Sequence, residues 1–325
     1  MAGRKAKPPS AVVAALQKEF GVGSSRLARE GSASDVSVII PTGLEVLDYW
    51  ILGCGGLPGG RIIELYADAG AGKTSLGFQF LASAQDAGGV AVLIETERTL
   101  DLNRAHVFGV DIDELVLFEP DSFEDVLEGL RRTLNVIPKG SPSVVVWDSL
   151  AATELAATHV TTGKKAYQIG KGSTTGKRAR LTSEALPLLA TIAAEKGCAV
   201  IIINQIRDKI GVMFGDSTTT PGGHAPKFHS TIRLQLWRGA AVKKGTDPVG
   251  IYTTIKATKN KLAIPFRKAK LRLDFATGFD DEWSLMHLGK ERSIVSKDAK
   301  ATEANLDLVR DFLQPDDESE EDDDE

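Results

Sequence analysis

Residues 61–75 read RIIELYADAGAGKTS, and this stretch decides the fold. The apolar run at 62–66 predicts a buried strand, and the pattern at 74–87 predicts a helix. Between them, residues 67–74 read ADAGAGKT. A glycine-rich turn that ends in Gly-Lys-Thr and joins a strand to a helix is typical of a phosphate-binding loop. Ala67 stands where the strict pattern has its first glycine, and alanine is a tolerated variant there.

The chemistry of such a loop specifies its ligand. Glycines let successive backbone N–H groups curl around phosphate oxygens, and the N-terminus of the following helix adds partial positive charge. The ammonium group of Lys73 reaches the terminal phosphates, and the hydroxyl of Thr74 ligates Mg²⁺. We therefore predict that the loop binds nucleotide phosphates and Mg²⁺. Its predicted nucleotide-binding residues are Asp68, Ala69, Gly70, Ala71, Gly72, Lys73, Thr74 and Ser75.

Beyond residue 61 the chain alternates apolar runs with helical patterns. Strands are predicted at 62–66, 90–94, 144–147 and 200–203, and helices at 74–87, 122–134 and 182–196. Near-continuous apolar strands separated by helices indicate an α/β fold with a mostly parallel sheet flanked by helices. A second β-rich group is predicted at 231–237, 250–258 and 270–275.

We predict four segments along the chain. Residues 1–36 form an N-terminal tail and helix, and residues 37–275 form the core. Residues 276–313 form a short C-terminal element that ends in a helix at 303–313, and residues 314–325 form an acidic, disordered tail.

The N-terminal helix is expected at 11–20, with Ser10 as its N-cap. Val12, Leu16 and Phe20 recur every four residues and make one apolar stripe. A short strand is expected at 36–40, ended by Pro41. One helix and one strand have little of their own to pack against, so we expect them to dock on the core or on a neighbouring copy.

Charge is distributed unevenly. Nine of the last ten residues, 316–325, are acidic, so the net charge of −5 becomes +4 for the rest of the chain. Such a block of like charge is a solubility tail, or it competes electrostatically for a basic surface of the same protein.

A phosphate-binding loop needs a carboxylate that holds Mg²⁺ through water. Asp148 closes the apolar run at 144–147, and ligands bind at the carboxyl ends of strands in open α/β sheets. An N-cap role for Asp148 is the alternative. Glu95 and Glu97 follow the strand at 90–94, and either could activate the attacking water as general base.

Composition favours a cytoplasmic protein. No apolar run approaches the ~20 residues of a membrane span, and the start MAGRKAKPPS lacks the apolar core of a signal peptide. The two cysteines, Cys54 and Cys198, are predicted to be buried thiols in a reducing compartment. With only these and five scattered histidines, a structural zinc site is not expected.

Two stretches, 161–178 and 207–223, break the alternation and are rich in glycine, threonine and basic residues. Long loops in a compact domain are usually functional or disordered. The second loop begins within NQIRDKIGVMFG, at 204–215, and continues in TTTPGGHAPKF, at 218–228.

These segments, together with the phosphate loop, IETERTLD, VVVWDSLAA and TKNKLAIPF, resemble the bacterial RecA recombinase family in order and spacing. The resemblance runs from about residue 11 to 290, and AALQKEFGVGS is similar to the family's oligomerisation helix. The C-terminal region is shorter than in the family and the first loop is divergent. Both departures resemble phage-encoded members of the RecA/UvsX type, so the resemblance places the chain in a bacterial or phage-infected bacterial cytoplasm.

The resemblance implies roles around ATP. It makes Glu97 the general base and places Asp101 and Phe275 near the adenine. Arg104 replaces an aromatic residue that stacks on the base, and a guanidinium group can also stack. Gln205 resembles the glutamine that senses the γ-phosphate, and it leads directly into the second loop.

The resemblance also implies a composite site between subunits. Lys259 and Lys261 match lysines that reach the ATP of the neighbouring subunit and neutralise charge at its γ-phosphate. Lys227 and Phe228 match a segment at the same subunit contact. By this resemblance, the catalytic residues are Lys73, Glu97, Gln205, Lys259 and Lys261.

For DNA, the resemblance implies backbone contacts and one apolar wedge, Ile210. The residues are Lys177, Arg178, Arg180, Ser183, Arg207, Lys209, Ile210, Gly222 and Gly223. Pro187 stands where the family has a basic residue. Lys164, Lys165 and Lys171 of the first loop, together with Lys177 and Arg178, compensate or belong to a solvated flexible loop. Phosphate contacts are independent of sequence, as recombination requires.

The expected function is ATP-dependent recombination on single-stranded DNA, with homologous duplex DNA as second partner. The protein would assemble with itself into a helical filament and meet a single-strand-binding protein or loader, and no membrane partner is expected. One alternative is a RecA-fold motor, such as a hexameric helicase or a regulatory ATPase, which would not explain residues 205–223. A second is a non-catalytic accessory module, against which the complete set of Lys73, Thr74, Glu97 and Asp148 argues.

Overall fold

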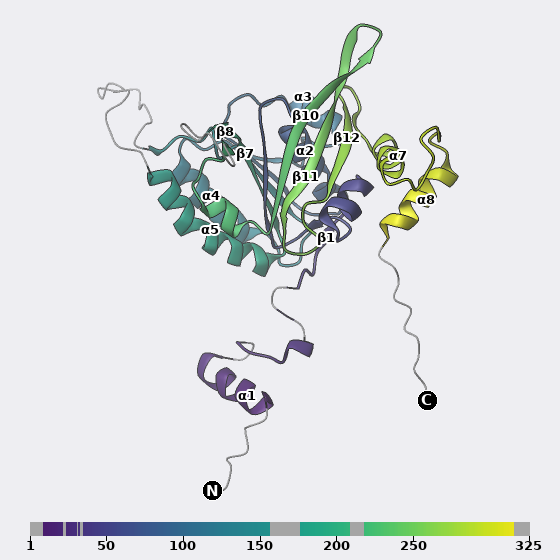
Figure 1. Ribbon diagram of the computed structural model, residues 1–325. Coiled ribbons are helices and arrows are strands. Elements are labelled where there is room, and N and C mark those ends of the chain that lie inside the picture. The colour runs from purple at the N-terminus through teal and green to yellow at the C-terminus, as the bar shows by residue number, and fades with distance from the viewer. Residues whose placement is uncertain are drawn as a thin grey trace, which may run out of the picture. The chain divides into compact units, whose positions relative to one another are not determined.

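The computed structural model describes residues 9–21, 24–30, 32, 35–156, 176–208 and 218–314 (Figure 1). Contacts divide the chain into two units, Met1–Ser37 and Val38–Glu325. In the first unit, helix α1 spans Pro9–Phe20 and the 3-10 turn η1 spans Ala28–Glu30. The expectation that Ser10 is an N-cap is wrong, because α1 begins at Pro9, whose fixed φ suits the first helical position.

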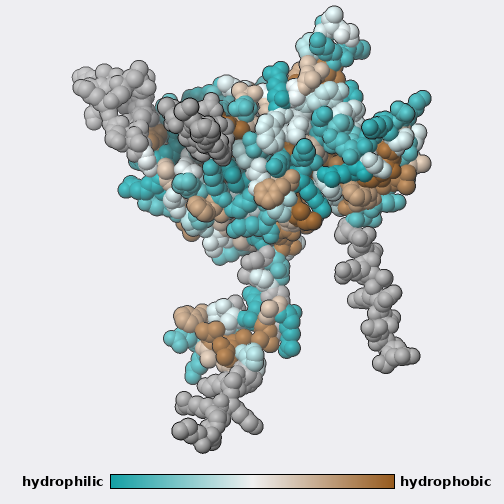
Figure 2. Space-filling model, in the orientation of Figure 1, coloured by the Kyte–Doolittle hydropathy of each residue, from teal (hydrophilic) through white to brown (hydrophobic). Residues whose placement is uncertain are grey.

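Helix α1 keeps its apolar face uncovered within the first unit. Val12, Leu16 and Phe20 are 49%, 42% and 71% exposed, and no residue of the helix is buried. Gln17 Nε2 donates to the carbonyl oxygen of Ser25 at 2.7 Å, so the polar segment turns back along the helix. Figure 2 shows apolar side chains gathered on α1. The apolar stripe is therefore present, and its docking on a neighbouring copy stays a prediction.

A nine-stranded sheet organises the second unit, within the residues that the structure describes (Figure 1). Its strand order is β13-β12-β11-β10-β3-β7-β6-β4-β5. The strands from β10 to β5 pair in parallel, and those from β10 to β13 pair antiparallel. The bounds are β3 Ile62–Ala67, β4 Ala91–Glu95, β5 Val116–Phe118, β6 Val144–Asp148, β7 Ala199–Gln205, β10 Ile232–Lys244, β11 Asp247–Asn260, β12 Lys268–Asp274 and β13 Gly278–Asp280. The predicted α/β fold is confirmed.

Helices cover both faces of the sheet. On β6, Val144 and Val146 point into one apolar core, and Val145 and Trp147 point into the other. The first core packs under α2, and the second packs under α4 and α5. The bounds are η2 Val46–Leu52, which is π-helical, α2 Lys73–Asp86, α3 Leu102–Val107, α4 Phe123–Val136, α5 Lys177–Lys196, α6 Ala225–His229, α7 Asp281–Glu291 and α8 Glu303–Leu313.

Two predicted elements have different bounds in the structure. The strand expected at 36–40 is limited to β1, Ile39–Ile40, which pairs with β2, Leu57–Pro58. Pro58 has no N–H to extend the ladder, and Pro41 ends β1 on the other side. The helix expected at 182–196 begins five residues earlier, at Lys177, directly after the left-handed Gly176.

The segment set apart as a C-terminal element, 276–313, packs against the sheet in the structure. Strand β13 extends the sheet beyond β12, and α7 packs on β12. Helix α8 is held to η2 by the ring contact of Phe312 with Trp50, at 5.7 Å between centroids. An ion pair of 3.0 Å between Arg310 Nε and Glu45 Oε1 adds to this contact.

Both cysteines are free, and Cys198 is buried while Cys54 is half-buried. Within the described residues, no helix is long and apolar enough to cross a membrane. In the same residues, no cluster of His, Cys, Asp and Glu side chains is arranged to hold a metal ion. The acidic tail, 316–325, lies outside the described residues.

Candidate functional site

The predicted phosphate-binding loop joins β3 to α2. Ala67 ends the strand and Lys73 begins the helix. Gly70 and Gly72 have φ values of 72° and 92°, which glycine adopts without the steric penalty of a Cβ atom. The free N–H groups at the start of α2 and those of the loop border one cavity. This local geometry follows directly from the positions of the glycines.

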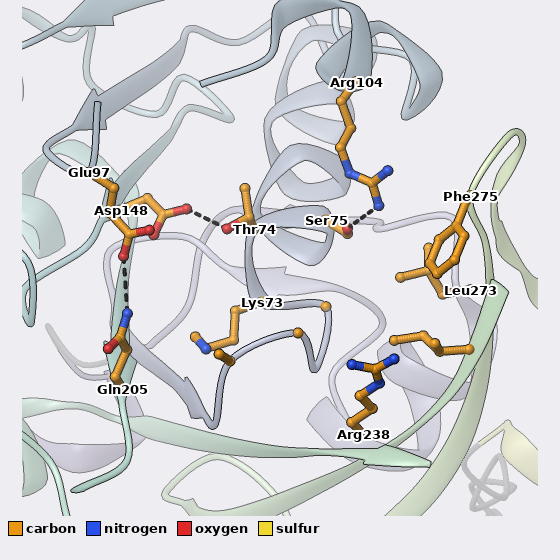
Figure 3. A pocket seen from close by; sticks show the side chains of 14 residues that line it. Lys73, Thr74, Ser75, Glu97, Arg104, Asp148, Gln205, Arg238, Leu273 and Phe275 are labelled. Carbon is orange, nitrogen blue, oxygen red and sulfur yellow. Dashed lines mark hydrogen bonds between the residues drawn. The ribbon is translucent and has the colours of Figure 1, made fainter. Parts of the chain in front are cut away.

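A cavity of about 350 Å³ opens over this loop (Figure 3). Polar groups of Glu97, Asp148 and Gln205 line one end of it, next to Lys73. The other end is lined by Arg104, Leu273 and Phe275. A charged end and a half-apolar end suit a ligand that carries phosphates on one side and a flat ring on the other.

Lys73 is a buried cation at the charged end. Its Nζ donates to the carbonyl oxygens of Ala67, at 3.1 Å, and Asp68, at 2.8 Å. Burial lowers the pKa of Lys73, and the negative charges of Asp148, Glu97 and Asp68 act in the opposite direction. The ammonium group therefore lies among the acidic groups that border the cavity.

Thr74 and Asp148 together offer oxygen ligands for a hard cation. Thr74 Oγ1 donates to Asp148 Oδ2 at 2.7 Å, and Asp148 is the last residue of β6. Burial raises the pKa of Asp148 to about 6, and the hydrogen bond from Thr74 counteracts part of this effect. A hydroxyl and a carboxylate at this separation fit Mg²⁺. The alternative N-cap role lacks a helix, because residues 149–152 form turns.

The structure separates the two glutamates that sequence periodicity left open. The carboxylate of Glu95 accepts hydrogen bonds from the backbone N–H groups of Arg98, at 2.8 Å, and Thr99, at 3.3 Å. Glu97 instead lines the cavity. Glu97 Oε1 accepts from Ser149 Oγ at 2.8 Å and from Gln205 Nε2 at 3.2 Å. Glu95 therefore stabilises its own turn, and Glu97 is available to chemistry in the cavity.

The wide end of the cavity combines a cation with aromatic rings. The Cζ of Arg104 lies 5.7 Å from the ring centroid of Phe275 and 5.8 Å from that of Phe108. Arg104 Nη2 also donates to Ser75 Oγ at 3.3 Å. Arg104 thus occupies this wall as a stacked guanidinium group. Asp101 caps α3 by accepting from the N–H groups of Asn103 and Arg104, and it lines a smaller neighbouring cavity.

Two residues in and beside the cavity were missed by the sequence analysis. Ser149 holds Glu97, and its only sequence signal is its place directly after Asp148. Arg238 enters the wall from β10, far along the chain, and its sequence neighbourhood is that of an ordinary exposed strand residue. Only the pairing of β10 with β3 brings Arg238 to the phosphate loop.

Glu124, near the start of α4, clamps the ends of the first loop. Its Oε2 accepts from the backbone N–H of Ala156 at 2.9 Å, and its Oε1 accepts from Lys177 Nζ at 2.8 Å. Burial acts to raise the pKa of Glu124, but these hydrogen bonds outweigh it and hold the pKa below its usual range. The residues between, 157–175, lie outside the described part of the chain.

The second loop begins at the charged end of the cavity. Gln205 ends β7, and the N–H of Ile206 donates to the carbonyl oxygen of Ala67 at 3.1 Å. Strands β8, Arg207–Asp208, and β9, Thr218–Thr219, then pair antiparallel and close the base of the loop. A chain of direct contacts thus connects Glu97, through Gln205, to the first residues of the loop.

Comparison with known proteins identifies the family. The RecA N-terminal domain model matches residues 9–280. The chain belongs to the RecA family. It is 41% identical to Protein RecA of Symbiobacterium thermophilum, over 88% of this chain and 79% of that protein. Protein RecA of Methylococcus capsulatus is 41% identical, over 90% and 81% of the two chains. That of Acholeplasma laidlawii is 38% identical, over 87% and 82%.

Membership of the RecA family establishes the activity. The protein is a DNA-dependent ATPase that uses ATP with Mg²⁺ and catalyses strand exchange in homologous recombination and repair. It binds single-stranded and duplex DNA and assembles with itself. The motor and accessory-module alternatives are thereby set aside. The relatives named above are bacterial, and a phage origin stays a prediction.

The structure sorts the DNA-binding residues predicted from the RecA resemblance. Lys177 is paired with Glu124. Arg178 donates to the carbonyl oxygens of Ala151 and Thr153, and its Cζ lies 5.7 Å from the ring centroid of Phe123. These two side chains therefore hold the end of the first loop in place.

Other predicted DNA contacts point outward or pack. Arg180 is 70% exposed along its side chain, and Arg207 and Ser183 are exposed. Gly222 and Gly223 have φ values of 93° and 72°. A Cβ atom on Gly223 would lie 2.9 Å from that of Ala179, so the end of the second loop packs closely on α5. The remaining predicted contacts, Lys164, Lys165, Lys171, Lys209 and Ile210, lie outside the described residues.

Lys259 and Lys261 follow β11 to an edge that is separate from the chain's own cavity. Lys259 Nζ donates to the carbonyl oxygens of Lys227, at 2.7 Å, and Phe228, at 3.0 Å. Burial, followed by the charges of Lys261 and Arg233, lowers the pKa of Lys259. Phe228 is 70% exposed. This edge therefore combines basic side chains with an exposed aromatic ring.

Proposed function

We propose that the cavity over the phosphate loop is the ATPase site of this recombinase. In this proposal Lys73 binds the terminal phosphates, Thr74 ligates Mg²⁺, and Asp148 holds the ion through water. Mg²⁺, when bound, neutralises charge on the β- and γ-phosphates. Glu97 accepts the proton of the attacking water. The observation that carries the proposal is the convergence of Glu97, Gln205 and Asp148 at the end of the cavity that holds Lys73.

We also propose that Gln205 connects ATP to DNA. Gln205 Nε2 donates to Glu97 Oε1 at 3.2 Å, which is a long hydrogen bond. A γ-phosphate at this end offers a more highly charged acceptor, so Gln205 turns toward it and Glu97 is released to activate water. Because β8 begins two residues after Gln205, this movement shifts the base of the DNA loop.

The roles of Lys259 and Lys261 require a second subunit. The support is their position outside their own cavity and beside the exposed Phe228. In a helical filament each subunit presents this edge to the ATP of the next, and such a head-to-tail contact does not close into a dimer. The exposed stripe of α1 would supply the other part of the subunit contact.

Replacing both lysines tests the composite site. We expect Lys259→Ala with Lys261→Ala to depress DNA-stimulated hydrolysis while nucleotide binding by the monomer stays nearly intact. Mixing this variant with Lys73→Ala subunits should partly restore hydrolysis, because some interfaces then pair an intact phosphate loop with intact lysines. The measurement is the ATPase rate across mixing ratios. Absence of rescue at every ratio, with co-assembly verified, would contradict a shared site.

Arg207 and Arg178 form a matched pair for DNA binding. We expect Arg207→Gln to weaken binding to single strands of any sequence and to reduce the salt dependence by about 0.7 in log–log slope, one phosphate contact. Arg178→Gln should mainly lower the melting temperature, because its guanidinium group satisfies the carbonyl oxygens of Ala151 and Thr153. Salt-dependent titrations and thermal melts measure both effects. The opposite assignment of the two defects would show that Arg178, not Arg207, binds DNA.

Electron microscopy with single-stranded DNA and a slowly hydrolysed ATP analogue, followed by a strand-exchange assay, tests the proposed function. We expect a helical filament and exchange products. A closed ring without exchange would support the motor alternative instead. Adding a single-strand-binding protein or a loader to the same assay tests those partners, and localisation in a bacterial cytoplasm remains part of the proposal.

A further inference from the structure

Arg238 lies against the phosphate loop, although it comes from the long β10–β11 hairpin. A Cβ atom built on Gly70 would lie 3.2 Å from Arg238 Nη1, so the guanidinium group touches the backbone of the loop. Arg238 is paired across the hairpin with Thr253. Thr253 Oγ1 donates to the carbonyl oxygen of Ala71 at 3.1 Å. The hairpin and the phosphate loop are therefore fastened to each other at this point.

The strand is irregular where Arg238 leaves it. The register between β10 and β11 shifts between Arg238 and Ala241, and such irregularities re-aim a side chain. The side chain is directed into the wall of the cavity (Figure 3). Within the described part of the chain, no ion pair joins Arg238 to an acidic group. Its charge is thus offered to the cavity.

The position of Arg238 along the cavity defines which part of a nucleotide it meets. Lys73 lies toward the end with Glu97 and Gln205, and Phe275 lies at the other end (Figure 3). Arg238 lies between these ends, beside Gly70. A nucleotide with its terminal phosphate at Lys73 and its base near Phe275 brings its inner phosphates past Arg238.

We propose that Arg238 binds the inner phosphates of the nucleotide, the α- and β-phosphates that ATP and ADP share. This inference rests on the proposed nucleotide site. A guanidinium group presents paired donors that match two phosphate oxygens. Since the inner phosphates remain after hydrolysis, Arg238 retains ADP, whereas Lys259 and Lys261 of a neighbour act on the γ-phosphate. Release of ADP then requires the hairpin contact to loosen.

Binding of ADP and of a slowly hydrolysed ATP analogue, measured by calorimetry without DNA, tests the proposal. We expect Arg238→Gln to weaken both ligands by a similar factor, about tenfold or more for a lost charged hydrogen bond. Arg238→Lys should recover part of the affinity, because it restores the charge without the paired donors. Lys243→Gln is the matched control, since it removes one exposed charge from the same strand outside the cavity, and it should bind like the wild type.

The outcomes separate the two levels of the argument. Affinities of Arg238→Gln within twofold of the wild type for both ligands would overturn the role of Arg238. A loss confined to the ATP analogue would place the side chain at the γ-phosphate and also overturn it. A wild-type protein that binds neither ligand would instead contradict the nucleotide site itself. Faster ADP dissociation from Arg238→Gln, measured by stopped flow, would support retention of ADP.

Discussion

Lys73→Ala is expected to abolish ATP hydrolysis, with a loss of at least about a hundredfold, because the terminal phosphates lose the positive charge beside them. The chain should remain folded. Lys73 contributes no apolar packing, and its Nζ contacts only the carbonyl oxygens of Ala67 and Asp68. Removing a buried ammonium group also removes the cost of its desolvation. The ATPase rate with saturating DNA and a thermal melt measure the two effects.

Arg61→Gln offers a control for this substitution, because it removes a positive charge from the residue just before β3, outside the cavity. Its ATPase rate should stay near that of the wild type. Hydrolysis near the wild-type rate in Lys73→Ala itself would refute the assignment of the phosphate loop.

Glu97→Gln is expected to bind ATP normally and to lose hydrolysis by about a hundredfold to ten-thousandfold, the range for removal of a general base. The amide keeps the size of the carboxylate and an acceptor for Ser149 Oγ and Gln205 Nε2. Only the ability to take a proton is removed. Since hydrolysis releases DNA in the proposed cycle, this variant should form long-lived filaments. Nucleotide titration, the ATPase rate and filament lifetime on DNA measure these outcomes.

Glu95→Gln is the matched variant two residues away. Glu95 accepts from the N–H groups of Arg98 and Thr99, so the weaker amide acceptor should cost stability and leave most of the hydrolysis. If Glu95→Gln loses hydrolysis and Glu97→Gln keeps it, the general base has been assigned to the wrong glutamate.

Several features of the site followed from sequence because their causes are local. The turn from β3 to α2 needs glycine at positions of positive φ, and Gly70 and Gly72 lie at such positions. The apolar runs that became β3, β4, β6 and β7 are continuous because each strand is buried on both faces. Asp148 was placed at the cavity by the end of such a run.

Other predictions missed because their outcome depends on neighbours. The strand expected at 36–40 has only two paired residues, since its partner offers no more. Lys177 and Arg178 were predicted to contact DNA from their basic side chains alone. In the structure Glu124 and the carbonyl oxygens of Ala151 and Thr153 occupy them. A charge pattern does not reveal which charges the fold already uses.

By itself, the sequence determined the phosphate loop, the class of the sheet and the family, because turn conformation and the periodicity of apolar residues are encoded within short segments. Only the tertiary structure decided that Glu97, rather than Glu95, faces the cavity, and that Arg238 reaches Gly70. These outcomes depend on the strand order, in which β10 pairs with β3 across more than 160 residues of chain. Contacts between such distant segments arise from packing, which no local pattern records.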